Sequence, residues 1–266
     1  MMHGISCICI TYRRSKLLEE AIESFLRQDY VGPKELIIVN DADDQVLHYD
    51  HPEVLIVNTG RRIRSIGEKR DLGIALAKYN YLAPWDDDDI YLPHRLSFSM
   101  EKMIAHNLSF YKLSDSYVYS VTDGIEKTST NWNYSASMFT KEIHELCGGH
   151  GYTNSGQDAI FMKKVQDICN GSTTHNLIED SISRGPSKLE DIYYVYRWGG
   201  IPVHLSAMRH FSDRDQLQQV SIERKKHDPA TGDIYLSPRW DLDYVELARA
   251  FRAKGHTPIH APSPRS

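Results

Sequence analysis

Tyr81-Leu82-Ala83-Pro84-Trp85-Asp86-Asp87-Asp88-Asp89 decides the interpretation of this chain, because an apolar run leads directly into four consecutive aspartates. Such a run predicts a buried strand. Adjacent carboxylates repel one another, and a divalent cation removes that cost. Carboxylate oxygens suit Mg²⁺ or Mn²⁺. An acidic turn that caps the next helix is the alternative, but the position after a buried strand favours metal binding.

Strands and helices alternate on the N-terminal side of this run. Apolar runs predict strands, and helical spacing of apolar residues predicts helices. The predicted strands are Ile5–Ile10, Glu35–Asn40 and Val54–Val57, and the predicted helices are 15–26, with Ser15 as N-cap, and Ile66–Tyr79. This alternation predicts an α/β fold with a mainly parallel sheet.

Polar residues follow three of the predicted strands. Thr11, Asp41 and the run from Asp86 to Asp89 stand where these strands end. Ligands of open α/β sheets bind at the carboxyl ends of the strands. The three strand ends are therefore expected to converge on one crevice.

The pattern changes after Pro93. Helices are expected at 93–107, 141–146, 158–168 and 244–253, and strands at 109–121, 134–139 and 193–196. We therefore predict a domain over residues 1–211, with halves at 1–95 and 96–211, and a C-terminal extension over 212–266. The extension is polar and ends in a Pro-rich tail.

Composition narrows the class of protein. The 266 residues are 41% hydrophobic with a net charge of −5, which gives no general attraction to nucleic acid or anionic membrane. The basic clusters 61–64 and 224–227 are interpreted as solvated surface.

Cys7 and Cys9 share one face of a predicted strand and are expected in the core. No apolar run reaches membrane-spanning length and no signal peptide is evident, so a cytoplasmic location is predicted. Peripheral membrane contact stays an alternative.

Four ordered segments carry a resemblance to family 2 glycosyltransferases of GT-A fold. They are a first-strand segment, a second strand ending in an acid, a segment similar to Ala-Arg-Asn-x-Gly, and a DxD segment followed by Pro. In this chain they are Ile8–Arg14, Glu35–Asp41, Gly67–Ala75 and Asp86–Pro93. The resemblance covers about residues 4–211. It implies a Rossmann-like nucleotide-binding half followed by an acceptor-binding half.

The resemblance also implies a role for each matched position. Asp41 would accept a hydrogen bond from the base of a uridine nucleotide, and Thr11 and Tyr12 would shape the base pocket. The remaining predicted donor contacts are Arg14, Arg70, Asp86 and Asp87, and the predicted ligands of Mn²⁺ or Mg²⁺ are Asp88, Asp86 and His204. Asp87 replaces a usually small residue, and Asp71 replaces the usual Asn.

Gly156-Gln157-Asp158 resembles the Glu-Asp segment whose Asp is the catalytic base. An inverting transfer needs a carboxylate that takes the proton of the acceptor hydroxyl. Asp158 is the candidate, and an aspartate that only caps its helix is the alternative.

The function predicted is a metal-dependent hexosyl- or pentosyltransferase that moves a sugar from a UDP-sugar to a hydroxyl, with inversion. A saccharide, a lipid-linked sugar or a modified nucleobase is an acceptor consistent with the sequence. A retaining reaction, a nucleotidyltransferase and a sugar-binding module without transfer are the alternatives. A nucleotidyltransferase would have a Gly-rich loop after the first strand, where this chain has Thr11-Tyr12-Arg13-Arg14.

Overall fold

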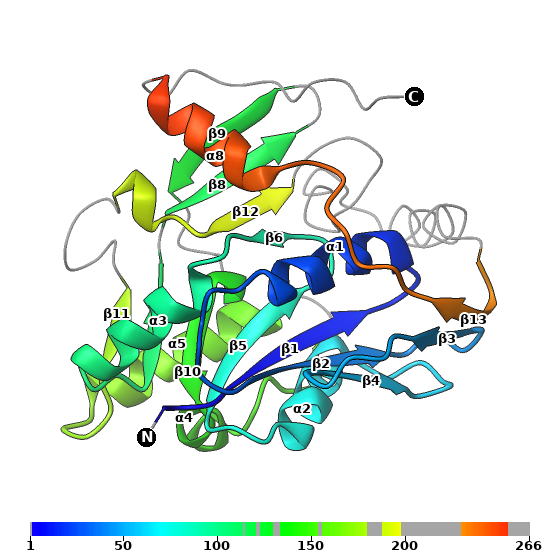
Figure 1. Ribbon diagram of the computed structural model, residues 1–266. Helices are drawn as coiled ribbons and strands as arrows, with labels where there is room; N and C mark the ends of the chain where they lie inside the picture. The colour runs from blue at the N-terminus through cyan, green and yellow to red at the C-terminus, as the bar shows by residue number, and fades with distance from the viewer. Residues whose placement is uncertain are drawn as a thin grey trace, which may run out of the picture.

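A seven-stranded mixed sheet forms the centre of the computed structural model (Figure 1). The structure describes residues 2–113, 115–120, 123–129, 134–153, 156–179, 188–197 and 230–254. The strand order is β11-β7-β10-β5-β1-β2-β4. The strands are β1 (Ile5–Thr11), β2 (Lys34–Asn40), β4 (Val54–Asn58), β5 (Tyr81–Asp86), β7 (Phe110–Lys112), β10 (Ser137–Thr140) and β11 (Leu177–Glu179).

Four neighbouring strands, β4, β2, β1 and β5, are parallel, whereas β10 runs antiparallel to both β5 and β7. This confirms the predicted α/β fold with a mixed, mainly parallel sheet. The register pairs Thr11 with Asn40 and Ile10 with Asp86. The carboxyl ends of β1, β2 and β5 are therefore level with one another.

Pro84 stands inside β5, where its missing N–H would interrupt a ladder on one side. β10 pairs with β5 only at Tyr81 and Leu82, so the ladder on that side has ended before Pro84. The Pro84 carbonyl instead accepts a 2.5 Å hydrogen bond from the buried Arg95 guanidinium, which also lies over the rings of Trp85 and Tyr91.

Each face of the main sheet packs on its own hydrophobic core. Successive side chains of a strand point to opposite faces, so Cys7 and Cys9 pack with α1 (Ser15–Leu26), while Ile8 packs with α2 (Ile66–Leu76). The second core also involves α4 (Lys141–Leu146) and α5 (Gln157–Asn170). α3 (Arg95–Ala105) packs into the first core, together with α1. In Figure 1, α1 lies above the sheet and α2 and α4 lie below it. Cys7 and Cys9 are fully buried, as predicted.

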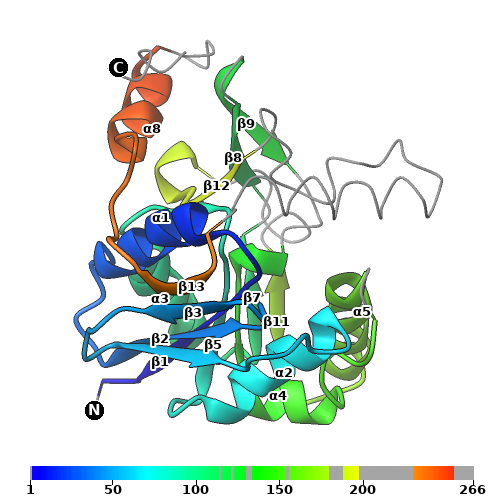
Figure 2. The same ribbon diagram turned by 90° about the vertical axis from the view of Figure 1, so that its right-hand side faces the viewer.

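A second sheet stands over α1 (Figure 2) and has the order β6-β12-β8-β9. Its strands are β6 (Ile90–Tyr91), β12 (Tyr194–Arg197), β8 (Asp115–Ser120) and β9 (Gly124–Ser129). α8 (Tyr244–Ala253) packs on it, with ring contacts from Phe251 to Tyr117 and from Tyr244 to Tyr119. β13 (Gly232–Tyr235) pairs in parallel with β3 (Gln45–His48). The described part of the C-terminal segment thus packs against both halves of the preceding chain.

Two local predictions about helices are wrong. α1 begins at Ser15 itself, and Arg14 occupies the N-cap without a side-chain cap. α2 ends at Leu76, three residues before the predicted end at Tyr79. The backbone N–H groups of Lys78 and Tyr79 donate instead to side chains of β2 and β1, Glu35 and Ser6.

The region predicted as a strand over 134–139 is only partly extended. Tyr134–Ala136 forms a 3₁₀ turn, η1, and β10 follows it. Within the described ranges, no helix is both long and apolar enough to cross a membrane.

Glu20, buried on α1, connects three elements. It forms an ion pair with Arg197 of β12, and its Oε1 accepts hydrogen bonds from the Tyr244 hydroxyl at 3.2 Å and the Asp241 N–H at 3.1 Å. Loss of one partner of a buried ion pair leaves the other charge uncompensated.

We predict that Glu20→Ala lowers the free energy of unfolding by about 3–5 kcal/mol, because Arg197 stays buried without its anion. Urea denaturation measures the change. Asp167→Ala, which breaks an exposed i,i+4 pair with Lys163, is the matched control and should cost less than about 1 kcal/mol. Equal losses in the two variants would contradict a structural role for the buried pair.

Candidate donor and metal site

The four aspartates form the turn between β5 and β6, at the edge of the sheet where the carboxyl ends of β1, β2 and β5 lie side by side. Asp86 ends β5 and keeps 22% of its side chain exposed, whereas Asp87 and Asp88 keep only 6% and 5%, and Asp89 is fully buried. The turn therefore places several carboxylates in a nearly dry environment, where each charge needs a partner.

Asp86 is held by groups from two other elements. Its carboxylate accepts hydrogen bonds from Arg70 Nη2 at 3.2 Å and from the Ser135 hydroxyl. Burial raises the pKa of Asp86 from 3.8 to about 6; Arg70 lowers it, and the charges of Asp89 and Asp88 raise it further.

Arg14 neutralises the middle of the run. Its Nη1 lies 2.9 Å from Asp87 Oδ1 and also pairs with Asp88. Burial raises the pKa of Asp87, and Arg14 opposes this shift. The guanidinium at the start of α1 thus compensates two adjacent carboxylates.

Asp89 contacts β12. It accepts hydrogen bonds from the Tyr194 hydroxyl at 2.5 Å and from the Arg197 N–H at 3.1 Å. Even so, Asp86, Asp88 and Asp89 can each offer one carboxylate oxygen, and these oxygens lie within 4.8 Å of one another. All-oxygen ligand sets of this kind suit Mg²⁺ or Mn²⁺.

Asp41, which follows β2, is almost fully buried beside two cations. Lys69 of α2 pairs with its Oδ1, Arg62 Nη1 lies 2.6 Å from the same oxygen, and the Ile63 N–H donates to Oδ2 at 3.1 Å. Lys69 also donates to the Thr11 carbonyl at 2.5 Å. Burial lowers the pKa of Lys69, while Asp41 raises it.

Tyr12 lies next to this group. The Arg62 guanidinium stacks on the Tyr12 ring, 3.7 Å from its centroid, and about half of the Arg62 side chain is exposed. Part of the basic cluster 61–64 therefore belongs to this site and is not only solvated surface. Thr11, Tyr12 and Asp41 are thus brought together around Lys69 and Arg62.

Asp158 lies in the first turn of α5 and is partly exposed. Its Oδ1 accepts a 2.9 Å hydrogen bond from the Ala159 N–H. Its charge contributes to the raised pKa values of Arg70 and Tyr134. The Arg70 guanidinium stands 4.7 Å from the Tyr134 ring centroid and contacts Asp86. Asp158 and Asp86 thus lie near the same arginine. His204 lies outside the described residues.

Lys69 and Arg62 did not emerge from the sequence as site residues. Basic residues are common on protein surfaces, both on helices such as α2 and in loops such as the one with Arg62, so the sequence does not show that these two belong to the site. The burial of Lys69 follows from the packing of α2 against the ends of β1 and β2.

Comparison with known proteins identifies the family. A model of the family described as "Glycosyl transferase family 2" matches residues 6–168, more than half of the chain. The chain belongs to glycosyl transferase family 2. The resemblance in the sequence is therefore confirmed, and so is the prediction of a glycosyltransferase with a GT-A fold.

One curated relative of this family 2 glycosyltransferase is the UDP-Glc:alpha-D-GlcNAc-diphosphoundecaprenol beta-1,3-glucosyltransferase WfgD of Escherichia coli. It is 24% identical over 110 residues, which are 40% of this chain and 43% of WfgD. The chain thus spans less than half the length of that relative.

Solved structures share the fold. S. aureus TarS 1–349 in complex with UDP-GlcNAc matches with a TM-score of 0.52 at 14% identity, over 92% of this chain and 69% of that one. The mannosyltransferase PcManGT from Pyrobaculum calidifontis, in complex with GDP-Man and Mn²⁺, matches with a TM-score of 0.50 at 14% identity, over 94% and 79%.

The raised pKa of Asp86 predicts how stability changes with pH in the metal-free protein. The folded chain keeps a proton on Asp86 at pH values where the unfolded chain has lost it, so stability falls as the pH rises from about 4 to about 6. Asp86→Asn removes this loss. We expect the stability advantage of this variant over the wild type to grow by about 2 kcal/mol across that window.

Urea unfolding in the presence of a chelator at several pH values measures the difference. The comparison with wild type is needed because burial lowers the pKa of His150 to about 4, which changes stability in the opposite direction. Asp167→Asn, an exposed change, is the control and should show no such trend. A constant difference between Asp86→Asn and wild type would contradict the raised pKa.

Proposed function

We propose that this glycosyltransferase moves a sugar from a UDP-sugar to an acceptor hydroxyl, with metal dependence and inversion at the anomeric carbon. The observation that carries the proposal is that the carboxyl ends of β1, β2 and β5 lie side by side at one edge of the sheet. This arrangement places Asp41 after β2 and Asp86 at the end of β5, on either side of β1. The side of this edge with Asp41 would hold the base, and the side with Asp86 would hold the diphosphate.

Asp41 and Tyr12 are the proposed base contacts. A carboxylate beside β2 can accept the ring N–H of uracil, and a base stacked on Tyr12 would take the place that the Arg62 guanidinium has in this structure. The half-exposed Arg62 can move more easily than the buried Lys69. WfgD is named for a UDP-glucose donor and TarS was solved with UDP-GlcNAc, which supports UDP, whereas PcManGT was solved with GDP-Man.

Asp86, Asp88 and Asp89 are the proposed residues for Mn²⁺ or Mg²⁺, with His204 as a further proposed ligand. Their oxygens suit these ions, and the mutual repulsion that helps to raise the pKa of Asp86 is the cost that a divalent cation would remove. Mn²⁺ is present in the PcManGT complex. When bound, the ion would act as a Lewis acid that stabilises charge on the leaving diphosphate.

Arg70 is the proposed cationic contact of the donor phosphates. Its Nη2 pairs with Asp86, while its buried Nη1 has no hydrogen-bond partner among the described residues. A buried guanidinium N–H without an acceptor is costly unless a ligand supplies one. Arg14 stays with Asp87 and Asp88 and would set their orientation.

Asp158 is the proposed catalytic base. Its carboxylate is partly exposed, so an acceptor can approach it, and it lies near the arginine that contacts Asp86. It would take the proton of the acceptor hydroxyl while that oxygen attacks the anomeric carbon on the face opposite the leaving diphosphate. The acceptor class, whether saccharide, lipid-linked sugar or modified nucleobase, stays open in this proposal.

Donor use and metal dependence are tested by incubating the purified full chain with a panel of UDP- and GDP-sugars, with and without Mn²⁺, and measuring the nucleoside diphosphate that is released. Release of UDP is expected only with Mn²⁺. Asp88→Asn should lower turnover at least about 100-fold, because a ligand of the charge-stabilising ion is lost. Asp50→Asn, an exposed change, should not affect it. Equal turnover with a chelator present would refute the metal dependence.

The role of Asp158 is tested with Asp158→Asn, which keeps the shape but cannot accept the proton. We expect kcat to fall about 10²- to 10⁴-fold, with little change in the KM of the donor, because general base catalysis contributes that much. Asp167→Asn on the same helix is the matched control. Near-normal kcat would exclude Asp158 as the base, and NMR of the product anomer would reveal retention.

A further inference from the structure

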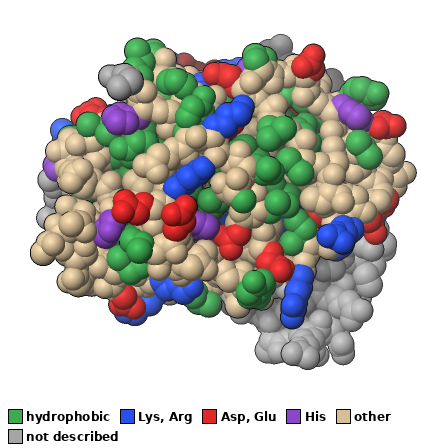
Figure 3. All heavy atoms as spheres, turned by 90° about the horizontal axis from the view of Figure 1, so that it is seen from below, with side chains coloured by type: hydrophobic (Ala, Val, Ile, Leu, Met, Phe, Trp, Pro, Cys, Tyr) green, Lys and Arg blue, Asp and Glu red, His purple; other side chains and the backbone are tan. Residues whose placement is uncertain are grey.

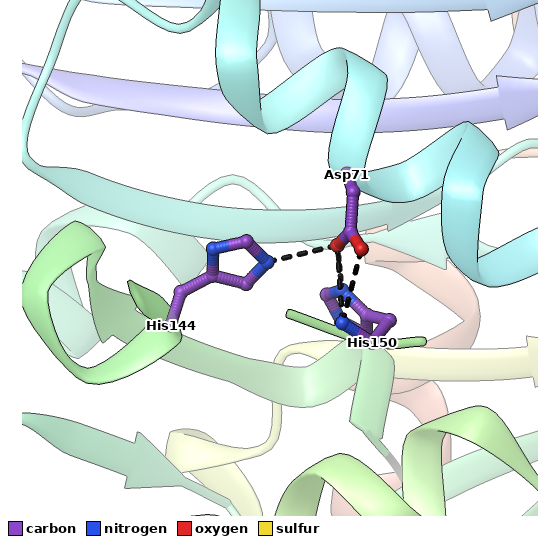
Figure 4. A group of neighbouring side chains, drawn as sticks. All are labelled: Asp71, His144 and His150. Carbon is purple, nitrogen blue, oxygen red and sulfur yellow. Dashed lines mark hydrogen bonds and ion pairs between the residues drawn. The ribbon is translucent and has the colours of Figure 1, made fainter. Parts of the chain in front are cut away.

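A second group of side chains with metal-binding chemistry lies outside the proposed donor site. Asp71 Oδ1 is 2.9 Å from His144 Nε2 and 2.7 Å from His150 Nδ1 (Figure 4). Each residue offers one ligand atom, and all three atoms lie within 4.8 Å of one another. Both histidines are buried, whereas Asp71 keeps 31% of its side chain exposed.

Three segments build this group. Asp71 projects from α2, His144 comes from α4, and His150 comes from the loop that follows α4. The backbone N–H of His150 also donates to the Asp71 carboxylate at 3.1 Å. Gly149 permits this approach, because a Cβ at that position would lie 2.6 Å from Asp71 Oδ2. The preceding residue, Arg70, contacts Asp86 instead, so α2 contributes one side chain to the histidine group and another to the aspartate turn.

The surroundings provide what a metal site needs beyond its ligands. His150 Nε2, the nitrogen that faces away from Asp71, lies 2.6 Å from the Tyr134 hydroxyl. A partner on the second ring nitrogen fixes the orientation of metal-binding imidazoles. A cavity of about 280 Å³ adjoins the group, lined by Asp71, Ile74, Ala75, Lys141, His144 and Glu145. Figure 3 views the face formed by α2 and α4, where acidic and histidine side chains lie next to one another at the surface.

We propose that Asp71, His144 and His150 form a second metal site, which binds a transition-metal cation of the Zn²⁺ class. Two imidazoles and one carboxylate suit zinc, with water from the cavity as the fourth ligand. In the metal-free state, Asp71 accepts hydrogen bonds from the same nitrogens that would bind the ion. Zinc bound at about 2.0–2.1 Å from each ligand separates ligand atoms by about 3.3 Å, so Asp71 Oδ1, now 2.9 and 2.7 Å from the two nitrogens, needs to part from each of them by only about half an ångström.

This site differs in chemistry from the aspartate turn. Asp86, Asp88 and Asp89 offer only oxygens, which favour Mg²⁺ or Mn²⁺, whereas imidazole nitrogens favour zinc, copper or nickel. The proposal does not depend on the proposed transferase reaction, so binding of the metal alone can test it. The link through Tyr134 to Arg70 places the second site beside the donor site.

The experiment is equilibrium dialysis of the chelator-treated full chain against buffered Zn²⁺, with metal analysis of the protein. We expect one zinc per chain with Mg²⁺ in excess. His144→Ala should weaken binding more than about 100-fold, and Tyr134→Phe, which removes the outer partner of His150, about 10- to 100-fold. His106→Ala, on a histidine at the end of α3, is the matched control. Asp88→Asn should also keep the zinc.

A second measurement uses the unaltered chain, in case the alanine variant does not fold. Co²⁺ bound by two imidazoles and a carboxylate in four-coordinate geometry gives intense visible absorption, which all-oxygen six-coordinate sites lack. We expect that spectrum, and its loss when Zn²⁺ is added. Absence of zinc binding, unchanged affinity in His144→Ala, or loss of the zinc in Asp88→Asn would each overturn the proposal.

Discussion

Four adjacent carboxylates in a nearly dry turn impose the main electrostatic constraint on this fold. Three neighbouring elements supply the partners of these carboxylates. Arg14 at the start of α1 pairs with Asp87 and Asp88, Arg70 of α2 pairs with Asp86, and Arg197 of β12 donates through its backbone to Asp89. Because charge burial is costly without partners, the buried turn depends on these three elements for its stability.

The same constraint ties the second sheet and the C-terminal helix to the site. The Arg197 side chain donates to the Asp88 carbonyl and pairs with Glu20, and Glu20 in turn accepts from the hydroxyl of Tyr244 on α8. A segment more than 200 residues from α1 in the chain thus helps to hold the arginine that orders the turn. Glu20, Arg197 and Tyr244 are buried, so water does not offset the loss of any one of them.

α2 contributes side chains to the proposed base site, the aspartate turn and the proposed zinc site. Three consecutive residues, Lys69, Arg70 and Asp71, reach Asp41, Asp86 and the pair of histidines respectively. Successive residues of a helix point in directions about 100° apart, so three consecutive residues can contact three different groups. The helix can approach this closely because a Cβ at Gly73 would lie 2.7 Å from Ile8 on the neighbouring strand, and a Cβ at Gly67 would lie 1.9 Å from the Gly151 carbonyl.

The sequence by itself determined the α/β class, the buried strands whose carboxyl ends carry Thr11, Asp41 and Asp86, and the core positions of Cys7 and Cys9. These follow from apolar runs and period-two alternation, which depend only on neighbours along the chain. Only the tertiary structure decided that Arg14 pairs with Asp87 and Asp88, that Lys69 is buried against Asp41, that His144 and His150 meet on Asp71, and that β13 pairs with β3. Such contacts join residues far apart in the chain, and their partners are selected by burial and charge, which leave no local periodicity to detect.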